Sequence, residues 1–142
     1  FGEIADGLTP RGEKLRQVFA SGGWTVELTP KALRAIWTKF IFLTGSAEIN
    51  AITQMTYGEM RTTMETRQLI FDAWDEIISV AQEKKVDLGD NTVELCEKYL
   101  DGFPTHGMSS FANDLRNGRQ MELEGLTGSV VRMGAEIGGY LL

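Results

Sequence analysis

Residues 30–53 read PKALRAIWTKFIFLTGSAEINAIT, and this stretch decides the fold. Apolar side chains fall on nearly every side of a helix drawn over it, and Thr29-Pro30 supplies the N-cap and proline typical of a helix start. A helix that is apolar all round belongs in the core of a domain. The stretch therefore predicts a central, buried helix.

The rest of the sequence predicts further helices at about 10–21, 58–85, 91–101, 108–116 and 120–137. In the longest of them, apolar residues such as Ile70, Trp74 and Ile77 recur at three- and four-residue steps, which is the pattern of an amphipathic helix. We therefore expect a mainly α fold, with a helical-bundle domain over residues 30–142.

Residues 1–29 differ in character from this helical part. An apolar stub at 1–4 precedes the helix at 10–21, and residues 24–28 alternate between apolar and polar as a half-buried strand does. These features predict a short β-α-β remnant of a Rossmann-type domain, incomplete because two strands do not make a stable sheet alone. The chain also begins at Phe1 rather than Met, and we interpret it as a piece of something longer.

Composition limits the class of function. The net charge is −6, which argues against a nucleic-acid partner because binding phosphates needs a surplus of Lys and Arg. No apolar run approaches the roughly 20 residues that cross a bilayer, so no membrane partner is expected. Cys96 is the one cysteine, which excludes an intrachain disulfide, predicts no metal site, and is typical of a reducing, cytoplasmic compartment.

Lys39 does not fit a purely structural helix. It stands among Ile36, Trp37, Phe40 and Ile41, and lysine is almost never fully buried without a partner. Lys39 is therefore a candidate functional residue. The alternative is a lysine at the domain edge whose ammonium group extends into solvent.

A second group of polar residues lies near the C-terminal end. Ser109-Ser110-Phe111-Ala112-Asn113-Asp114 has the form of a helix start, and Glu122 is expected in the first turn of the final helix. Helix capping explains both patterns without a catalytic role. His106, in a loop with no Asp or Cys at a suitable spacing, is interpreted as structural.

Taken together, these segments resemble the ketopantoate reductase (2-dehydropantoate 2-reductase) family. The resemblance rests on Ile36-Trp37-Thr38-Lys39-Phe40, on Tyr57-Gly58-Glu59-Met60-Arg61, and above all on the segment from Ser109 through Asp114 to Glu122. It implies a C-terminal helical domain like that of 6-phosphogluconate dehydrogenase, preceded by the end of a nucleotide-binding domain.

The resemblance also implies an activity and a set of site residues. Lys39 and Glu122 would be catalytic, and Ser110 and Asp114 would bind substrate, in an NADPH-dependent reductase that converts ketopantoate to pantoate for pantothenate biosynthesis. No glycine-rich fingerprint follows a strand here. NADPH would therefore be bound mainly by a separate nucleotide-binding domain, and we expect this chain alone to be inactive.

Two departures from the family pattern leave the substrate open. Leu43 and Ala47 stand where the best-known members have asparagines, and Asn50 is out of register with either position. A different, less polar 2-oxo acid is therefore an alternative substrate. A second alternative is a helical dimerisation or interaction domain, with a homodimer as the partner.

Overall fold

The computed structural model describes residues 1–138, and it divides the chain into two compact units, Phe1–Trp37 and Thr38–Leu142. The described residues form helices and contain no strand. The helices are α1 (Pro10–Ser21), α2 (Ala32–Thr53), α3 (Tyr57–Thr62), α4 (Met64–Glu83), α5 (Thr92–Gly102), α6 (Ser110–Arg116) and α7 (Thr127–Glu136). The prediction of a mainly α fold is confirmed.

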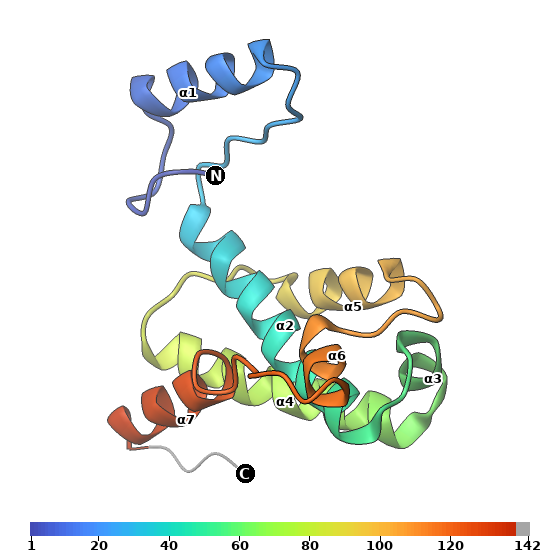
Figure 1. Cartoon of the computed structure of the whole chain (residues 1–142). Coiled ribbons are helices and arrows are strands. Elements are labelled where there is room, and N and C mark those ends of the chain that lie inside the picture. Colours follow the sequence, from blue (N-terminus) through green and yellow to red (C-terminus); the bar gives the residue numbers. More distant parts are fainter. Residues whose placement is uncertain (139–142) are drawn as a thin grey trace. The chain divides into compact units, whose positions relative to one another are not determined.

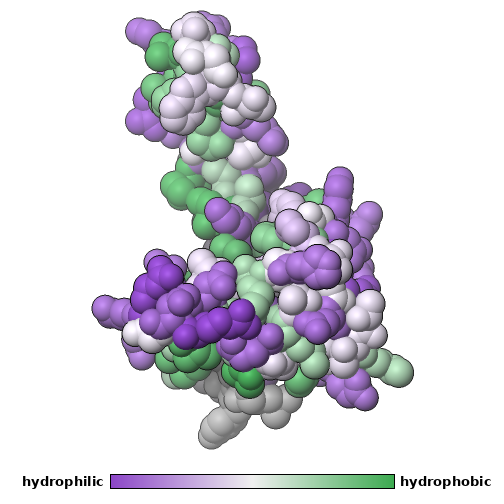
Figure 2. Space-filling model, turned by 45° about the vertical axis from the view of Figure 1, so that its right-hand side comes forward, coloured by the Kyte–Doolittle hydropathy of each residue, from purple (hydrophilic) through white to green (hydrophobic). Residues whose placement is uncertain are grey.

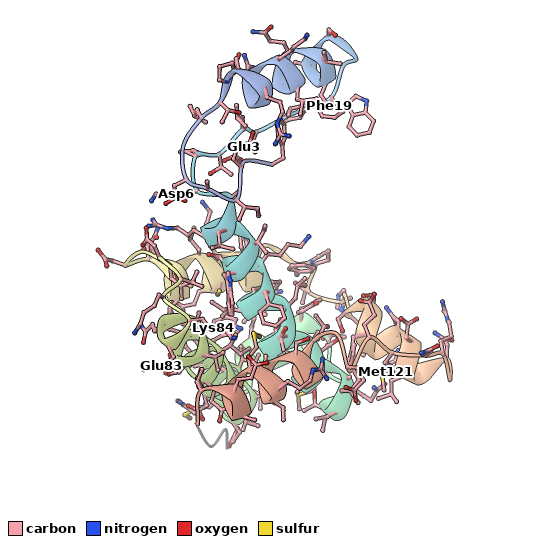
Figure 3. All side chains as sticks on the ribbon, turned by 90° about the vertical axis from the view of Figure 1, so that its left-hand side faces the viewer. Glu3, Asp6, Phe19, Glu83, Lys84 and Met121 are labelled. Atoms are coloured by element: carbon pink, nitrogen blue, oxygen red, sulfur yellow. The ribbon has the colours of Figure 1, made fainter. Side chains whose placement is uncertain are left out.

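In the N-terminal unit, α1 begins where the sequence predicts. The Thr9 hydroxyl accepts a hydrogen bond from the Gly12 N–H and donates one to Glu3, which also pairs with Arg11. Phe19 lies on α1 (Figure 3). Its ring packs edge-on against Phe1, at a ring-centroid distance of 6.0 Å. Hydrophobic residues also reach the surface of each unit among hydrophilic ones (Figure 2).

The predicted strands of this unit are wrong. Residues 24–28 run alongside Phe1, where the Phe1 ammonium donates to the Glu27 carbonyl and the Thr29 N–H donates to the Phe1 carbonyl, at 2.9 Å each. This pairing involves a single residue of the first segment, so it is too short to form a ladder. The predicted β-α-β remnant is therefore one helix between irregular segments.

In the second unit, the part of α2 from Thr38 onward lies among the other helices (Figure 1). Phe42 contacts Trp74 of α4 and Tyr99 of α5, with ring centroids 6.3 and 5.7 Å apart. The Cys96 thiol of α5 contacts the Thr38 carbonyl at 3.6 Å. Ile41, Phe42, Ala47 and Trp74 are all buried. The prediction that this helix is central is confirmed for its second half.

The long helix predicted at 58–85 is two helices. Thr63 has an extended backbone, with φ −88° and ψ 116°, which ends α3 and begins α4. The Thr66 hydroxyl stabilises the break because it lies 3.0 Å from the carbonyl oxygens of both Met60 and Thr63. A local side-chain interaction therefore overrides the continuous apolar pattern.

Candidate active site

A pocket of about 200 Å³ opens between α2, α6 and the turn before α7. Ser110, Asp114 and Glu122, three of the four residues predicted for the site, line it together. Leu43 and Ala47, the two positions expected to set specificity, form its α2 wall. The full lining is Leu43, Ala47, Tyr57, Phe103, Met108, Ser109, Ser110, Phe111, Asp114, Glu122 and Leu126. The structure thus brings distant parts of the sequence to one pocket.

The start of α6 is fixed by Asn50, a fully buried residue of α2. The Asn50 side-chain oxygen accepts hydrogen bonds from the Ser109 N–H at 2.7 Å and the Ser109 hydroxyl at 2.8 Å. Its amide group donates to the Met55 carbonyl. The Ser109 hydroxyl in turn accepts from the Ala112 N–H at 3.0 Å, as an N-cap. Asn50 therefore holds the segment that carries Ser110.

Sequence reasoning missed this role of Asn50. The signal was available, because a buried amide in an otherwise apolar helix needs hydrogen-bond partners. Its interpretation depended on which segment packs against it, and Ser109 is far away along the chain. Ser110 itself is exposed, so its hydroxyl lies at the surface of the pocket rather than within the hydrogen-bond network below it.

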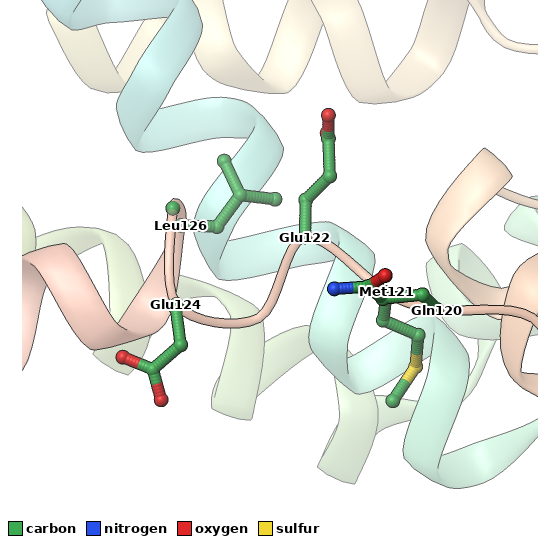
Figure 4. Close-up of a pocket in the computed structure, with 6 residues that line it drawn as sticks. Gln120, Met121, Glu122, Glu124 and Leu126 are labelled. Carbon is green, nitrogen blue, oxygen red and sulfur yellow. The ribbon is translucent and has the colours of Figure 1, made fainter.

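Glu122 lies in a turn and not in a helix, because α7 begins at Thr127. The expectation of Glu122 in the first turn of the final helix is wrong. Its carbonyl accepts hydrogen bonds from the N–H groups of Gly125 and Leu126, at 3.1 and 3.0 Å, which closes the turn. Figure 4 shows the Glu122 and Glu124 side chains pointing to opposite sides of this segment. Glu122 also lines a second, more open hollow of about 560 Å³ along the turn.

Asp114, one α-helical turn after Ser110, forms an ion pair with Arg119. The Arg119 guanidinium lies 3.6 Å from the Asp114 carboxylate, and the Arg119 N–H donates to the Asp114 carbonyl at 2.8 Å. This contact ties the end of α6 to the loop that follows. Arg119 is also a cation close to a residue of the pocket, a placement that the sequence alone did not predict.

Lys39 is exposed, and it lines neither the pocket of about 200 Å³ nor the hollow of about 560 Å³. This exposure agrees with the alternative prediction of a lysine at the domain edge, and Ile36 on the same helix is also exposed, at 54%. Lys39, Leu43 and Ala47 follow one another at four-residue steps, so they lie on one face of α2. Lys39 is thus one helical turn, roughly 6 Å along the axis, from the pocket wall.

Aromatic residues form the wall next to the loop 103–109. Phe103 stacks on Phe42 and lies against Tyr57, with ring centroids 5.5 and 4.6 Å apart. The loop is held against α3 because the Tyr57 N–H donates to Gly107 and the Gly58 N–H donates to Thr105, at 2.9 and 2.8 Å. Burial raises the pKa of the Tyr57 phenol, so Tyr57 stays neutral.

The cysteine of the second unit is unsuited to chemistry in this pocket. Cys96 is fully buried, and burial raises the pKa of its thiol to about 12, which keeps it from acting as a thiolate.

Within residues 1–138, no group of three or more His, Cys, Asp and Glu side chains could hold a metal ion. In the same residues, no helix is long and apolar enough to span a bilayer.

Residues 31–139 match the family model described as "Ketopantoate reductase PanE/ApbA C terminal". The chain belongs to this family. It is 26% identical over 113 residues to the 2-dehydropantoate 2-reductase of Halobacterium salinarum, a match that covers 80% of this chain and 37% of that protein. The predicted resemblance is confirmed.

Solved structures of a reductase and a dehydrogenase share the fold of this chain. The PanE/ApbA family ketopantoate reductase from Ralstonia eutropha superposes with a TM-score of 0.82 at 30% identity, over 93% of this chain and 44% of that one. A D-mandelate dehydrogenase in complex with NADH and anilino(oxo)acetate has a TM-score of 0.83 at 19% identity, over 98% and 46%. The chain therefore spans less than half the length of these relatives.

Proposed function

We propose that this chain is the substrate-binding part of an NADPH-dependent 2-oxo acid reductase, with reduction of ketopantoate to pantoate as the reference reaction. The supporting observation is the pocket that Ser110, Asp114 and Glu122 line together, one helical turn from Lys39. The relative from Halobacterium salinarum is itself a 2-dehydropantoate 2-reductase. A cytoplasmic location suits such an enzyme and its free thiol at Cys96.

The proposed roles follow from the chemistry of ketone reduction. Negative charge develops on the ketone oxygen, and the Lys39 ammonium would stabilise it and supply the proton. The exposed Ser110 hydroxyl would donate to the substrate carboxylate in a charge-assisted hydrogen bond. Glu122 would orient the Lys39 ammonium or accept from a substrate hydroxyl, and Asp114, paired with Arg119, would fix the end of α6.

A nicotinamide coenzyme supplies the hydride in reductases of this kind. Residues 1–138 do not fit such a group, because they contain no sheet and no glycine-rich turn between a strand and a helix. We therefore assign NADPH to a separate nucleotide-binding domain, which is the first proposed partner of this chain. The second partner is the 2-oxo acid.

The test is ketopantoate-dependent oxidation of NADPH by the full-length product of the gene. We expect Lys39→Ala to lower kcat/KM by about 10²–10⁴-fold, the usual contribution of a positioned proton donor. Lys98→Ala, at an exposed position of α5 away from the pocket, is the matched control and should keep the wild-type rate. Retention of most of the rate by Lys39→Ala would remove Lys39 from the mechanism.

A groove of about 740 Å³ between α2 and α4 favours a second function, homodimerisation. Ile52 and Leu69 line it and are 81% and 53% exposed, so the groove presents apolar side chains from two helices to solvent. Sedimentation of wild type and Ile52→Glu would test this function. A dimer that dissociates in the variant supports it, and a monomeric wild type contradicts it.

A further inference from the structure

The pocket next to Ser110 has one polar side and one apolar side, which limits the substrates that can bind there. Resting on the proposed function, we propose that it selects a 2-oxo acid whose side chain is apolar and of about the size of a phenyl ring, in preference to one whose side chain bears a hydroxyl. Ketopantoate would then be a poor substrate.

The first observation is the distribution of polar atoms around the pocket. Ser110, Asp114 and Glu122 come from α6 and the following turn, on one side. The side formed by α2 contributes Leu43 and Ala47, which offer no hydrogen bond. A substrate can therefore bind its oxo acid group on the polar side, whereas its side chain must lie against aliphatic carbon.

Ser109 does not relieve this lack of polar partners, although it also lines the pocket. Its hydroxyl donates to Asn50 at 2.8 Å and accepts from the Ala112 N–H at 3.0 Å. Asn50, which could have replaced the missing amides, is fully buried and occupied with Ser109 and Met55. Against the α2 wall, a hydroxyl on the substrate side chain would lose its bonds to water and find no free partner in Leu43, Ala47, Ser109 or Asn50.

The second observation is the aromatic wall. Phe103 is 37% exposed, so part of its ring surface faces outward although it stacks on Phe42 and lies against Tyr57. Hydrogen bonds between the loop 103–109 and α3 hold this wall in place. A flat apolar substituent would extend the stack, and aromatic pairs of this kind gain more than their buried area alone provides.

The third observation is size. The pocket measures about 200 Å³, and an apolar protein cavity of about 150 Å³ is known to accept benzene. A phenyl ring therefore fits, with room left for part of the oxo acid group. Phe111, Met108 and Leu126 line the remaining surface with apolar atoms.

The experiment compares three acids with the full-length product of the gene and either NADPH or NADH. Ketopantoate and trimethylpyruvate differ only in one hydroxyl, and benzoylformate carries a phenyl ring. We expect kcat/KM for trimethylpyruvate and benzoylformate to exceed that for ketopantoate by about 10–100-fold, the range that follows from one buried hydroxyl without a partner. Ketopantoate as the best substrate would overturn this inference and leave the proposed function standing. Turnover of none of the acids would overturn both.

Variants of the α2 wall and the aromatic wall test which of them sets the substrate preference. Ala47→Asn introduces an amide on the α2 side and should raise the ratio of ketopantoate to trimethylpyruvate turnover by about 10-fold. Phe103→Ala should lower turnover of benzoylformate more than that of trimethylpyruvate. Met64→Asn, an equally polar change at an exposed position of α4 that lines neither this pocket nor the groove between α2 and α4, should change neither ratio. Unchanged ratios in the first two variants would contradict the assignment.

Binding gives a readout independent of turnover and of the coenzyme. Met108 and Met121 pack against the cluster of Ala47, Ala51, Phe111 and Ala112, whereas Met64 is 80% exposed on α4. In methyl NMR spectra of this chain, benzoylformate should shift the Met108 and Met121 signals at lower concentration than ketopantoate, and should leave Met64 unchanged. The reverse order of the two acids would count against the inference.

Discussion

Replacement of Asn50 by leucine tests whether the buried amide holds the α6 segment in place. The Asn50 side-chain oxygen accepts both hydrogen bonds from Ser109, and its amide group donates to the Met55 carbonyl. Leucine has a similar size but cannot make any of these bonds. The substitution therefore leaves the buried Ser109 N–H and the part-buried Met55 carbonyl without their partner.

The magnitude follows from these two backbone groups. A buried polar group that loses its partner costs about 1–3 kcal/mol, so Asn50→Leu should lower the free energy of unfolding by roughly 2–5 kcal/mol. Ser109→Ala removes the N-cap and one of the two bonds to Asn50, and should cost about 1–2 kcal/mol. Because the two residues share a bond, the double variant should lose less than the sum of the single losses, by about 1 kcal/mol.

Urea unfolding followed by circular dichroism measures all four proteins of this cycle. Asn113→Leu is the matched control, because Asn113 is an exposed residue of α6 and its replacement should stay within about 0.5 kcal/mol of wild type. If Asn50→Leu were as stable as the control, the amide would not be anchoring α6, and the explanation of how Ser110 is positioned would be wrong.

Three further outcomes follow from buried groups of the second unit. Burial raises the pKa of Glu48, so the native protein binds its proton more tightly than the unfolded chain does. Wild type should therefore lose stability relative to Glu48→Gln as the pH rises from about 4.5 through the raised pKa. Thermal melts at several pH values measure this, and parallel curves for the two proteins would refute it. The Cys96 thiol, with a pKa of about 12, should resist Ellman's reagent at pH 8 until urea unfolds the protein, whereas rapid labelling of the native state would show that it is accessible. A methyl group added at Gly45 would lie 2.5 Å from the buried Trp74 ring, so Gly45→Ala should lower the free energy of unfolding in urea by about 1–3 kcal/mol. Gly102 has open space around it, so Gly102→Ala should be neutral. Equal stability of the two variants would refute the close contact.

The sequence predicted the features that depend on local periodicity. An apolar stretch as long as 30–53 has few alternatives to a helix in a core, and α2 occupies 32–53. The grouping of Ser110, Asp114 and Glu122 came from the family resemblance, and the pocket that they line is consistent with it. The catalytic and binding roles assigned to them remain predictions.

The features that the sequence failed to predict depend on partners far along the chain or on side chains that bond to the local backbone. The end of α3 at Thr63 depends on the Thr66 hydroxyl, which no apolar pattern reveals. A turn forms at Glu122, before α7 begins, because the N–H groups of Gly125 and Leu126 donate to the Glu122 carbonyl. The exposure of Lys39 also depends on distant packing, because α5 covers the side of that turn of α2 that carries Thr38 and leaves Lys39 exposed.

A crystal structure of the full-length product of the gene with oxamate, a 2-oxo acid analogue that is not reduced, tests the central claim most directly. We expect the oxamate carboxylate within hydrogen-bond distance of the Ser110 hydroxyl and the Lys39 ammonium turned toward its amide oxygen. Oxamate bound elsewhere, with Lys39 still directed into solvent, would contradict the assignment of this pocket as the substrate site.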